Sequence, residues 1–396
     1  LIGMEHRANG AAIYHAVACL PALIGAWRHP GGGLLHMTAS LAATAVDGSA
    51  LDMPQLENPA LRSFNMVQLG RALTAEHLDP PVAALVVYGS NPAVTMPNQA
   101  LVRRGLARED LFTVVHEQTL TDTARYADYV LPATTQLEHL DLMSSWGQTC
   151  LALNRPAIAP VGEARPTTQL FRDLAAAMGL GEPWLQESDE SLARAALATG
   201  HPYLDGITFE RLWEDGWALL ALPRPWLPFA DGGFPTPSGK TEFRSSALAA
   251  AGGDPLPSWT PPDTDARWPL SLLTAKSEVH FLNSGYAGLA WHRRAAGEPL
   301  LDLHADDAAA RGIADGDLVR VFNERGELRV RARVADRVRP GIAALPFGWG
   351  SGRAETGNGS GALANLLTSD GLSDLGGGGD FADTRVEVSG LAAGSG

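Results

Sequence analysis

The sequence predicts an α/β nucleotide-binding region followed by an all-β domain. Two apolar runs, residues 82–88 and 111–115, are separated by a helix-length segment and are rich in β-branched residues. Neither run alternates apolar with polar residues, so both suit parallel strands that helices cover on both faces. After Trp268 the chain changes to short apolar runs with closely spaced turn signals, which is typical of a β-barrel or a β-sandwich.

The size and composition of the chain bound its class. Its 396 residues suffice for two or three domains, and a net charge of -14 with a pI near 5.2 argues against a nucleic-acid partner. The only cysteines, Cys19 and Cys150, exclude a disulfide framework and a CxxC metal site, and we expect both to be buried apolar side chains. The sequence contains no run of 18 or more apolar residues, so it predicts no membrane span.

The beginning of the chain resembles the middle of a longer polypeptide. It opens at Leu1 without an initiator methionine or a charged and apolar leader. Residues 2–27 predict a loop and then a helix whose apolar stripe ends before Pro30 and three glycines. We therefore expect an N-terminal part of the same protein to precede these residues.

Polar loops follow both apolar runs of the α/β region. The carboxyl ends of parallel strands meet at one edge of a sheet, where ligands bind, so the loops converge there. They carry Gly89, Ser90, Asn91, Thr95, Glu117 and Thr119. Gly89 permits close backbone approach, and Glu117 can accept hydrogen bonds from a ribose or a guanine edge. The alternative is that residues 90–92 form only a turn. A helix at residues 98–104 is expected to end at Gly105.

The pattern of segments predicts three regions. Residues 1–180 form the incomplete α/β region, and a helix at residues 168–178, capped by Gly179, closes it. Residues 181–265 are rich in Trp and Pro and predict a wrapping connector rather than a third core, with helices at 190–198 and 209–214 and a short strand at 241–243. Residues 266–396 form the all-β domain.

Strands of the all-β domain are predicted at residues 270–274, 300–303, 318–322, 328–334 and 384–388. A short helix at 306–311 ends at Gly312, and residues 323–326 make a hairpin turn. Alternation places Arg329, Arg331 and Arg333 on one strand face, either a solvated outer face or a row that faces an anion. The glycines at 357–361 and 376–379 indicate either close approach of the backbone to a ligand or second domain, or a flexible surface loop.

Six motifs in order resemble the C-terminal part of the molybdenum or tungsten bis-molybdopterin guanine dinucleotide oxidoreductases, the dimethyl sulfoxide reductase and formate dehydrogenase superfamily. They are GMEHRANG at 3–10, LIGAWRHPGGG at 23–33, GSNP at 89–92 with TARYADYVLPAT at 123–134, PSGKTEF at 237–243, LHADDAAARGIADGDLVRVFNERG at 303–326 and NLLTSD at 365–370. The resemblance covers nearly the whole chain. It implies a partial doubly wound, Rossmann-like nucleotide-binding domain followed by a C-terminal double-psi β-barrel.

The resemblance also implies a set of cofactor-binding residues. On the α/β side they are Gly89, Asn91, Thr95, Glu117 and Thr134, around the guanosine and phosphates of one dinucleotide. On the barrel side they are Thr274, Lys276, His280, Asn283 and Ser284 in TAKSEVHFLNS, together with Asn365. Lys276 supplies charge to a diphosphate, and Asn365 can serve both donor and acceptor positions of a pterin edge. The family also brings His6 and Asn9 near the dinucleotide, and Trp146, His139 and Trp291 are candidates for a substrate funnel.

The resemblance predicts parts that this sequence does not contain. In the superfamily the iron–sulfur cysteines, the first nucleotide-binding segments and the residue that ligates the metal precede the matched region. We therefore expect a small-molecule substrate, the missing N-terminal half and an electron-transfer subunit as partners, and an inactive fragment when the chain is alone. The alternatives are a hydratase or transhydroxylase of the same superfamily, or a scaffold subunit that lost the metal. The free cysteines fit a cytoplasmic location.

Overall fold

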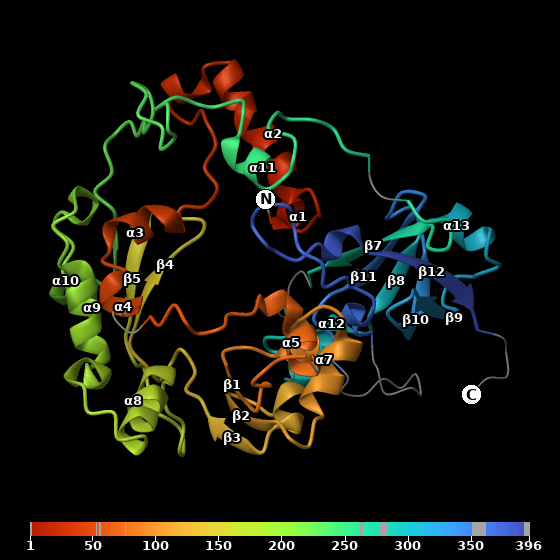
Figure 1. Cartoon of the computed structure of the whole chain (residues 1–396), viewed down its shortest axis with the longest axis horizontal. Coiled ribbons are helices and arrows are strands. Elements are labelled where there is room, and N and C mark those ends of the chain that lie inside the picture. The colour runs from red at the N-terminus through yellow and green to blue at the C-terminus, as the bar shows by residue number, and fades with distance from the viewer. Residues whose placement is uncertain are drawn as a thin grey trace.

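The computed structural model describes residues 2–52, 54, 57–75, 77–261, 264–276, 283–287, 289–350 and 362–391. In Figure 1 a barrel lies on the right, a parallel sheet lies below the centre, and a second sheet with its helices lies on the left. Above them lie α2 (Gly10–Leu23) and α11 (Ser246–Ala250). Within the described ranges, no helix has both the length and the apolar character needed to cross a membrane.

The parallel sheet contains the two predicted strands and a third. Its order is β1 (Ala84–Tyr88), β2 (Phe112–Glu117) and β3 (Tyr129–Pro132), all parallel. The crossover from β1 to β2 contains α6 (Pro92–Thr95) and α7 (Gln99–Leu106), as a βαβ unit requires.

Gly105 does not end the crossover helix, contrary to the prediction, because α7 continues through it to Leu106. A Cβ atom at Gly105 would lie 2.5 Å from the Cβ of Leu73 in α5 (Leu69–Thr74). The glycine therefore serves the close packing of α5 on α7 rather than a helix stop.

Helices cover neither face of the parallel sheet completely, which corrects the expectation that both faces are covered. Val87 and Val115 on the inner face are buried against Ala124. On the other face, Val86, Phe112 and Tyr129 are 44%, 50% and 61% exposed. Here Phe171 of α8 (Thr167–Ala177) packs against Tyr88 at the carboxyl end of β1.

The second sheet gives part of the supposed connector a hydrophobic core, so the prediction of a coreless wrapping segment is wrong there. Strands β4 (Asp141–Ser144), β5 (Cys150–Asn154) and β6 (Trp217–Leu219) pair antiparallel. Leu151, Leu153, Leu197, Phe209 and Leu212 pack together in this core. Its helices are α3 (Ala39–Ala45), α9 (Asp189–Leu197) and α10 (Phe209–Asp215). Residues 241–243 are not a strand.

The C-terminal region closes into a six-stranded barrel in the order β10-β8-β11-β7-β12-β9, which confirms the predicted barrel. The strands are β7 (Leu270–Ala275), β8 (Leu300–Leu303), β9 (Leu318–Phe322), β10 (Glu327–Val334), β11 (Ile342–Pro346) and β12 (Arg385–Gly390). The sequence missed β11. Alternate side chains point inward and are buried, among them Leu301, Val321 and Val330.

The arginine row of β10 lies on the outside of the barrel. Arg333 makes two hydrogen bonds to Asp302, at 2.5 Å and 2.9 Å, and the side chain of Arg331 is 56% exposed. These two arginines therefore follow the outer-face alternative.

The remaining elements are short. The α-helices are α1 (Ile2–Glu5), α4 (Ser49–Asp52), α12 (Ala290–Ala296) and α13 (Ala305–Ala309). The 3₁₀ helices are η1 (Ala26–Arg28), η3 (Met66–Gln68), η4 (Thr123–Tyr126), η5 (Pro183–Gln186), η6 (Pro202–Leu204), η7 (Ala364–Leu366) and η8 (Phe381–Asp383).

The loops of residues 365–383 join the barrel to the N-terminal elements. The carboxylate of Asp374 accepts hydrogen bonds from the backbone N–H groups of Ala11 and Ala12, at 2.8 Å and 3.1 Å. These donors lie in the first turn of α2, where helical N–H groups lack a partner within the helix and a negative charge is favourable. The backbone N–H of Asn98 donates to the carbonyl of Thr368 at 3.1 Å. Hydrogen bonds thus connect the loops of residues 365–383 to the N-terminal α/β part of the chain.

Candidate functional site

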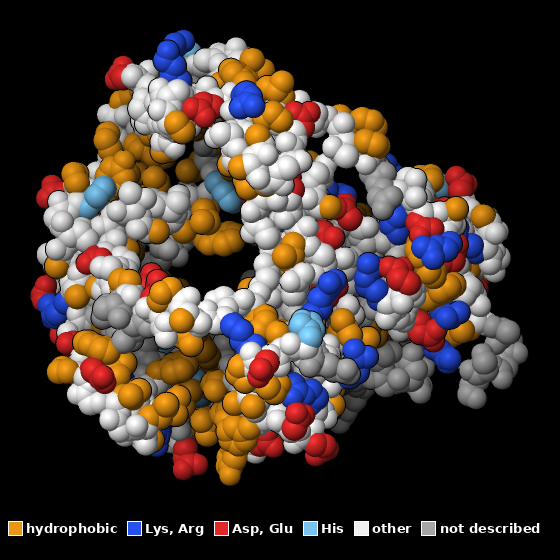
Figure 2. All heavy atoms as spheres, in the orientation of Figure 1, with side chains coloured by type: hydrophobic (Ala, Val, Ile, Leu, Met, Phe, Trp, Pro, Cys, Tyr) orange, Lys and Arg blue, Asp and Glu red, His pale blue; other side chains and the backbone are white. Residues whose placement is uncertain are grey.

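A cavity of about 1880 Å³ lies between the loops of the parallel sheet and the loops of the barrel. On the sheet side it is lined by residues that follow β1 and β2, and on the barrel side by residues that follow β7 and β11. Figure 2 shows the molecule as a whole to be hollowed rather than evenly rounded. The carboxyl edge of the sheet is therefore the wall of a large cavity, as the sequence predicted from strand direction.

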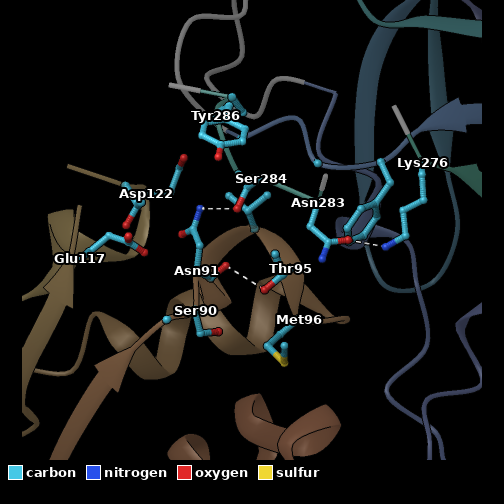
Figure 3. Close-up of a pocket in the computed structure, with 18 of the residues that line it drawn as sticks. Ser90, Asn91, Thr95, Met96, Glu117, Asp122, Lys276, Asn283, Ser284 and Tyr286 are labelled. Atoms are coloured by element: carbon cyan, nitrogen blue, oxygen red, sulfur yellow. Dashed lines mark hydrogen bonds between the residues drawn. The ribbon is translucent and has the colours of Figure 1, made fainter. Parts of the chain in front are cut away.

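Asn91 is the residue that holds this wall together. Its side-chain oxygen accepts hydrogen bonds from the backbone N–H of Thr123 at 3.1 Å and from the Thr123 hydroxyl at 2.7 Å. Its amide nitrogen donates to the hydroxyl of Ser284 at 3.1 Å. Figure 3 shows this last bond reaching across the cavity wall from the sheet side to the barrel side. Asn91 thus fixes the loop after β1 to both η4 and the barrel side.

Three further predicted residues line the sheet side of the cavity. Gly89 has a φ of 58°, a left-handed conformation that glycine adopts without strain. The hydroxyl of Thr95 donates to the carbonyl of Asn91 at 3.0 Å, which tightens the same loop. Glu117 follows at the end of β2, and its carboxylate accepts the backbone N–H of Gln118 at 2.8 Å.

Lys276 provides the positive charge on the barrel side. Its amine donates to the side-chain oxygen of Asn283 and lies 4.5 Å from the ring centre of Phe347. The side chain is exposed to the cavity, but the protein atoms around its ammonium group displace water and lower the pKa of Lys276. Among the described residues, no carboxylate lies within ion-pair distance of this amine. Such an ammonium group is available to a bound anion.

A glycine wall, residues 376–379, closes the cavity on the side of the N-terminal segment. Asn65 donates to the carbonyl of Gly377 at 2.7 Å, and His6 contacts the carbonyl of Gly379 through Nδ1 at 3.1 Å. Because a carbonyl only accepts, Nδ1 of His6 carries the proton. The His6 ring also packs on Phe381, with ring centres 4.1 Å apart. These glycines therefore follow the close-approach alternative, since their backbone lies against the α/β part.

Three of the predicted cofactor-binding residues do not line this cavity, and a fourth is not among the residues that the structure describes. Thr134 is buried and bonds to Nδ1 of His139 at 2.9 Å, and Thr274 lies in β7, paired with Leu345. Asn365 is 3% exposed, donates to the carbonyl of Val94 at 2.8 Å and accepts from the hydroxyl of Thr368 at 2.8 Å. His280 lies outside the described residues. Their cofactor contacts remain predictions.

The cavity also contains residues that the sequence did not point to. They include Asn65, Gln118, Asp122, Arg125, Tyr286, Arg294 and Phe347. Tyr286 has a φ of 65°, which is uncommon for a residue with a side chain, and Figure 3 shows it above Asn91 and Ser284. Of the funnel candidates, Trp146 and Trp291 are 65% and 59% exposed.

The residues present fit a long anionic dinucleotide. The cavity is large enough for a nucleotide and a second ring system. Lys276, Arg125 and Arg294 place positive charge along it, beside the carboxylates of Glu117, Asp122 and Glu298. Gly376 and Gly378 offer backbone without side-chain bulk. Among the described residues, no group of three or more His, Cys, Asp or Glu side chains is placed to hold a metal ion.

A parallel sheet, a C-terminal barrel and a large polar cavity between them are typical of a protein that binds a dinucleotide cofactor. Residues 2–177 match the Molybdopterin oxidoreductase family, and residues 270–385 match the Molydopterin dinucleotide binding domain. The chain belongs to the molybdopterin oxidoreductase family, as its motifs predicted. The match to the dinucleotide-binding domain confirms the prediction of a molybdopterin dinucleotide cofactor.

Known proteins and solved structures are similar to the chain. It is 39% identical to the probable oxidoreductase YoaE of Bacillus subtilis, over 98% of this chain and 55% of that protein. It is 30% identical to the biotin sulfoxide reductase of Cereibacter sphaeroides, over 87% and 51%. The acetylene hydratase of Pelobacter acetylenicus shares the fold with a TM-score of 0.69 and 24% identity, over 90% of this chain and 50% of that one. The chain spans about half the length of these relatives.

Proposed function

We propose that this chain is the C-terminal cofactor-binding portion of a bis-molybdopterin guanine dinucleotide oxidoreductase that carries out two-electron redox or oxygen-atom transfer on a small molecule. The observation that carries the proposal is the cavity between sheet and barrel, which polar loops of both domains line. A molybdenum or tungsten ion held by two such dinucleotides supplies the redox chemistry. The chain itself supplies binding, orientation and charge.

Each wall has a distinct task in this proposal. On the sheet side, Glu117 accepts hydrogen bonds from the guanosine end, and the loop fixed by Asn91 shapes the space around it. On the barrel side, Lys276 neutralises phosphate charge. The glycine wall lets the flat pterin system approach the backbone closely.

The rest of the catalytic machinery is proposed to lie in the part of the protein that this chain does not span. That part includes the residue that ligates the metal and an iron–sulfur cluster. We accordingly propose that residues 1–396 alone do not turn over substrate. The hydratase and scaffold alternatives differ from the leading proposal in the chemistry of the metal, which the residues of this chain do not determine.

Cofactor analysis of the purified protein tests the proposal. Acid release followed by oxidation converts a bound molybdopterin to a fluorescent pterin, and hydrolysis frees guanosine monophosphate from the dinucleotide. We expect both products, together with molybdenum or tungsten by elemental analysis. A protein that folds and carries neither pterin nor metal under metal-replete expression overturns the proposal and favours the scaffold alternative.

A further inference from the structure

Arg329, the first arginine of the β10 row, lacks the partners that the other two arginines of the row have. Arg331 donates to the carbonyl of Gly316 at 3.1 Å, and Arg333 binds the carboxylate of Asp302. The side chain of Arg329 is partly buried, and its Nε–H group is shielded from water without an acceptor among the described residues. Shielded N–H groups normally have an acceptor, so Arg329 indicates a partner that the described residues do not supply.

The strand beside β10 places a second arginine next to Arg329. In the antiparallel pair of β9 and β10, Arg329 lies directly opposite Arg320. Like charges in this position repel each other. Two carboxylates of the region are already engaged: Glu327 accepts a hydrogen bond from Nε of Arg320 at 2.7 Å, and Glu298 lies 3.9 Å from Arg331. Three guanidinium groups thus stand against two carboxylates, and the positive charge of Arg329 is the unmatched one.

Arg320, Arg329 and Arg331, the outer arginine cluster, lie on the outside of the barrel, because the alternate residues Leu328 and Val330 are buried in its core. None of the three arginines lines the cavity between sheet and barrel. The chain as a whole has a net charge of -14, so its general field does not attract anions. An anion on this surface would therefore be held by the cluster itself.

We propose that the outer arginine cluster binds a small oxyanion of the phosphate class. A guanidinium group presents its N–H donors in a planar fork that matches the oxygen atoms of phosphate. The bound oxyanion accepts the shielded Nε–H group of Arg329 and offsets the repulsion between Arg329 and Arg320. Glu327 and Glu298 belong to the same surface, and their negative charges disfavour an extended polyanion there. The site is therefore expected to take a single anionic group.

Arginine labelling of the full polypeptide encoded by the gene tests the site residue by residue. p-Hydroxyphenylglyoxal reacts with accessible guanidinium groups, and mass spectrometry of the peptides gives the labelling rate of each arginine. Inorganic phosphate is the probe, exchanged for chloride at constant ionic strength. We expect phosphate to slow the labelling of Arg329 in a saturable manner. Arg337, a barrel arginine that is 58% exposed and lies 3.8 Å from Asp302, should keep its rate.

Equilibrium dialysis with radiolabelled phosphate measures the affinity of variants of the same polypeptide. Arg329→Gln should weaken phosphate binding about tenfold or more, the loss expected when a charge-assisted hydrogen bond is removed. Arg337→Gln removes the same charge from the barrel and should leave the affinity unchanged, which separates a specific contact from the general charge of the domain.

Three results overturn the proposal. If Arg329 is unreactive without phosphate, another group of the protein already holds it. If Arg329 is labelled at the same rate with and without phosphate, it only faces water. Equal phosphate affinity in Arg329→Gln and in the wild type means that the anion binds elsewhere. The proposed function survives each of these results, because the outer arginine cluster does not line the cavity.

Discussion

Arg71 on α5 makes two hydrogen bonds to the buried carboxylate of Asp370 in the barrel region, at 2.6 Å and 2.9 Å. Asp370 is 4% exposed. Burial alone raises the pKa of this carboxyl group, but the hydrogen bonds from Arg71 and Asn98 outweigh it, and the pKa of Asp370 is lowered. The pair joins two regions that are 299 residues apart in the sequence.

We predict that Asp370→Asn lowers the free energy of unfolding by about 2 kcal/mol at neutral pH, because two charge-assisted hydrogen bonds are weakened in a buried setting. Since the folded pKa is lowered, this contribution is fully present above the ordinary carboxyl pKa of about 4 and is lost as pH falls through the folded value. Urea unfolding between pH 7 and pH 3 measures it.

Asp110→Asn is the matched control for that measurement. Asp110 also makes two hydrogen bonds to one arginine, Arg108, but its side chain is 72% exposed. Water screens an exposed pair of this kind, so we expect its loss to change stability much less than the loss of the Arg71–Asp370 pair. Equal losses in the two variants would contradict the view that burial gives the Arg71–Asp370 pair its importance.

We predict that replacing Asn91 destabilises the cavity wall more than replacing Ser284, one of its hydrogen-bond partners. Asn91→Ala leaves the N–H and hydroxyl of Thr123 without their acceptor, and Thr123 is fully buried. We expect a loss of about 1 to 3 kcal/mol in unfolding free energy and a lower pterin content. Ser284→Ala removes only the bond that crosses the cavity wall. A Ser284→Ala loss as large as that of Asn91→Ala would show that the cross-wall bond alone is important.

Local sequence patterns predicted the strands well where the signal is local. β8 and β9 begin and end where their apolar runs do, because alternating buried side chains and flanking turns mark both ends. Gly105 shows the limit. Its role depends on Leu73, 32 residues earlier, and a stop signal and a packing glycine look the same in a sequence.

The candidate site was predictable as a set of chemical groups, but not as a set of contacts. Strand direction placed Asn91 and Glu117 at one edge, and both line the cavity. Which groups are already engaged within the protein does not follow from residue type: Asn365 uses its amide to join η7 to α6. No local sequence pattern pointed to Asn65 as a cavity residue, because its hydrogen-bond partner Gly377 lies 312 residues away.

Lys276 is predicted to make anion binding depend on pH. Lys276→Gln should weaken the binding of guanosine diphosphate, used as a probe, about tenfold, since a hydrogen bond to a charged group is worth about 1.5 kcal/mol or more. Because the pKa of Lys276 is lowered, its ammonium group loses its proton at a lower pH than a free lysine does. Wild-type binding should therefore weaken as pH rises through that value, and calorimetry at a series of pH values measures this.

The other lysine of the chain, Lys240, lies outside the cavity and provides the control. Lys240→Gln should leave both the affinity and its pH profile unchanged. If Lys276→Gln keeps the wild-type pH profile, another group titrates, and Lys276 does not contact the phosphates.

Two different reasons can require glycine in the glycine wall: tight packing within the protein, tested at Gly379, and close approach of a cofactor, tested at Gly376. A Cβ atom at Gly379 would lie 2.7 Å from the ring of Phe381 and 3.2 Å from Val67, and the ring is held in place by His6. We predict that Gly379→Ala lowers the unfolding free energy by about 1 to 3 kcal/mol, the usual cost of overpacking. A Cβ at Gly376 would meet only Ser373, at 3.9 Å.

Gly376→Ala should therefore change stability by less than about 0.5 kcal/mol, as surface substitutions do. Gly376 lines the cavity, so a bound cofactor is the partner that an added methyl group would test. Urea unfolding and pterin content measured on both variants separate the two effects. Reduced pterin content in Gly376→Ala at wild-type stability would mean that the backbone there touches the cofactor. Wild-type values for both quantities would mean that the glycine wall serves only the contact between domains.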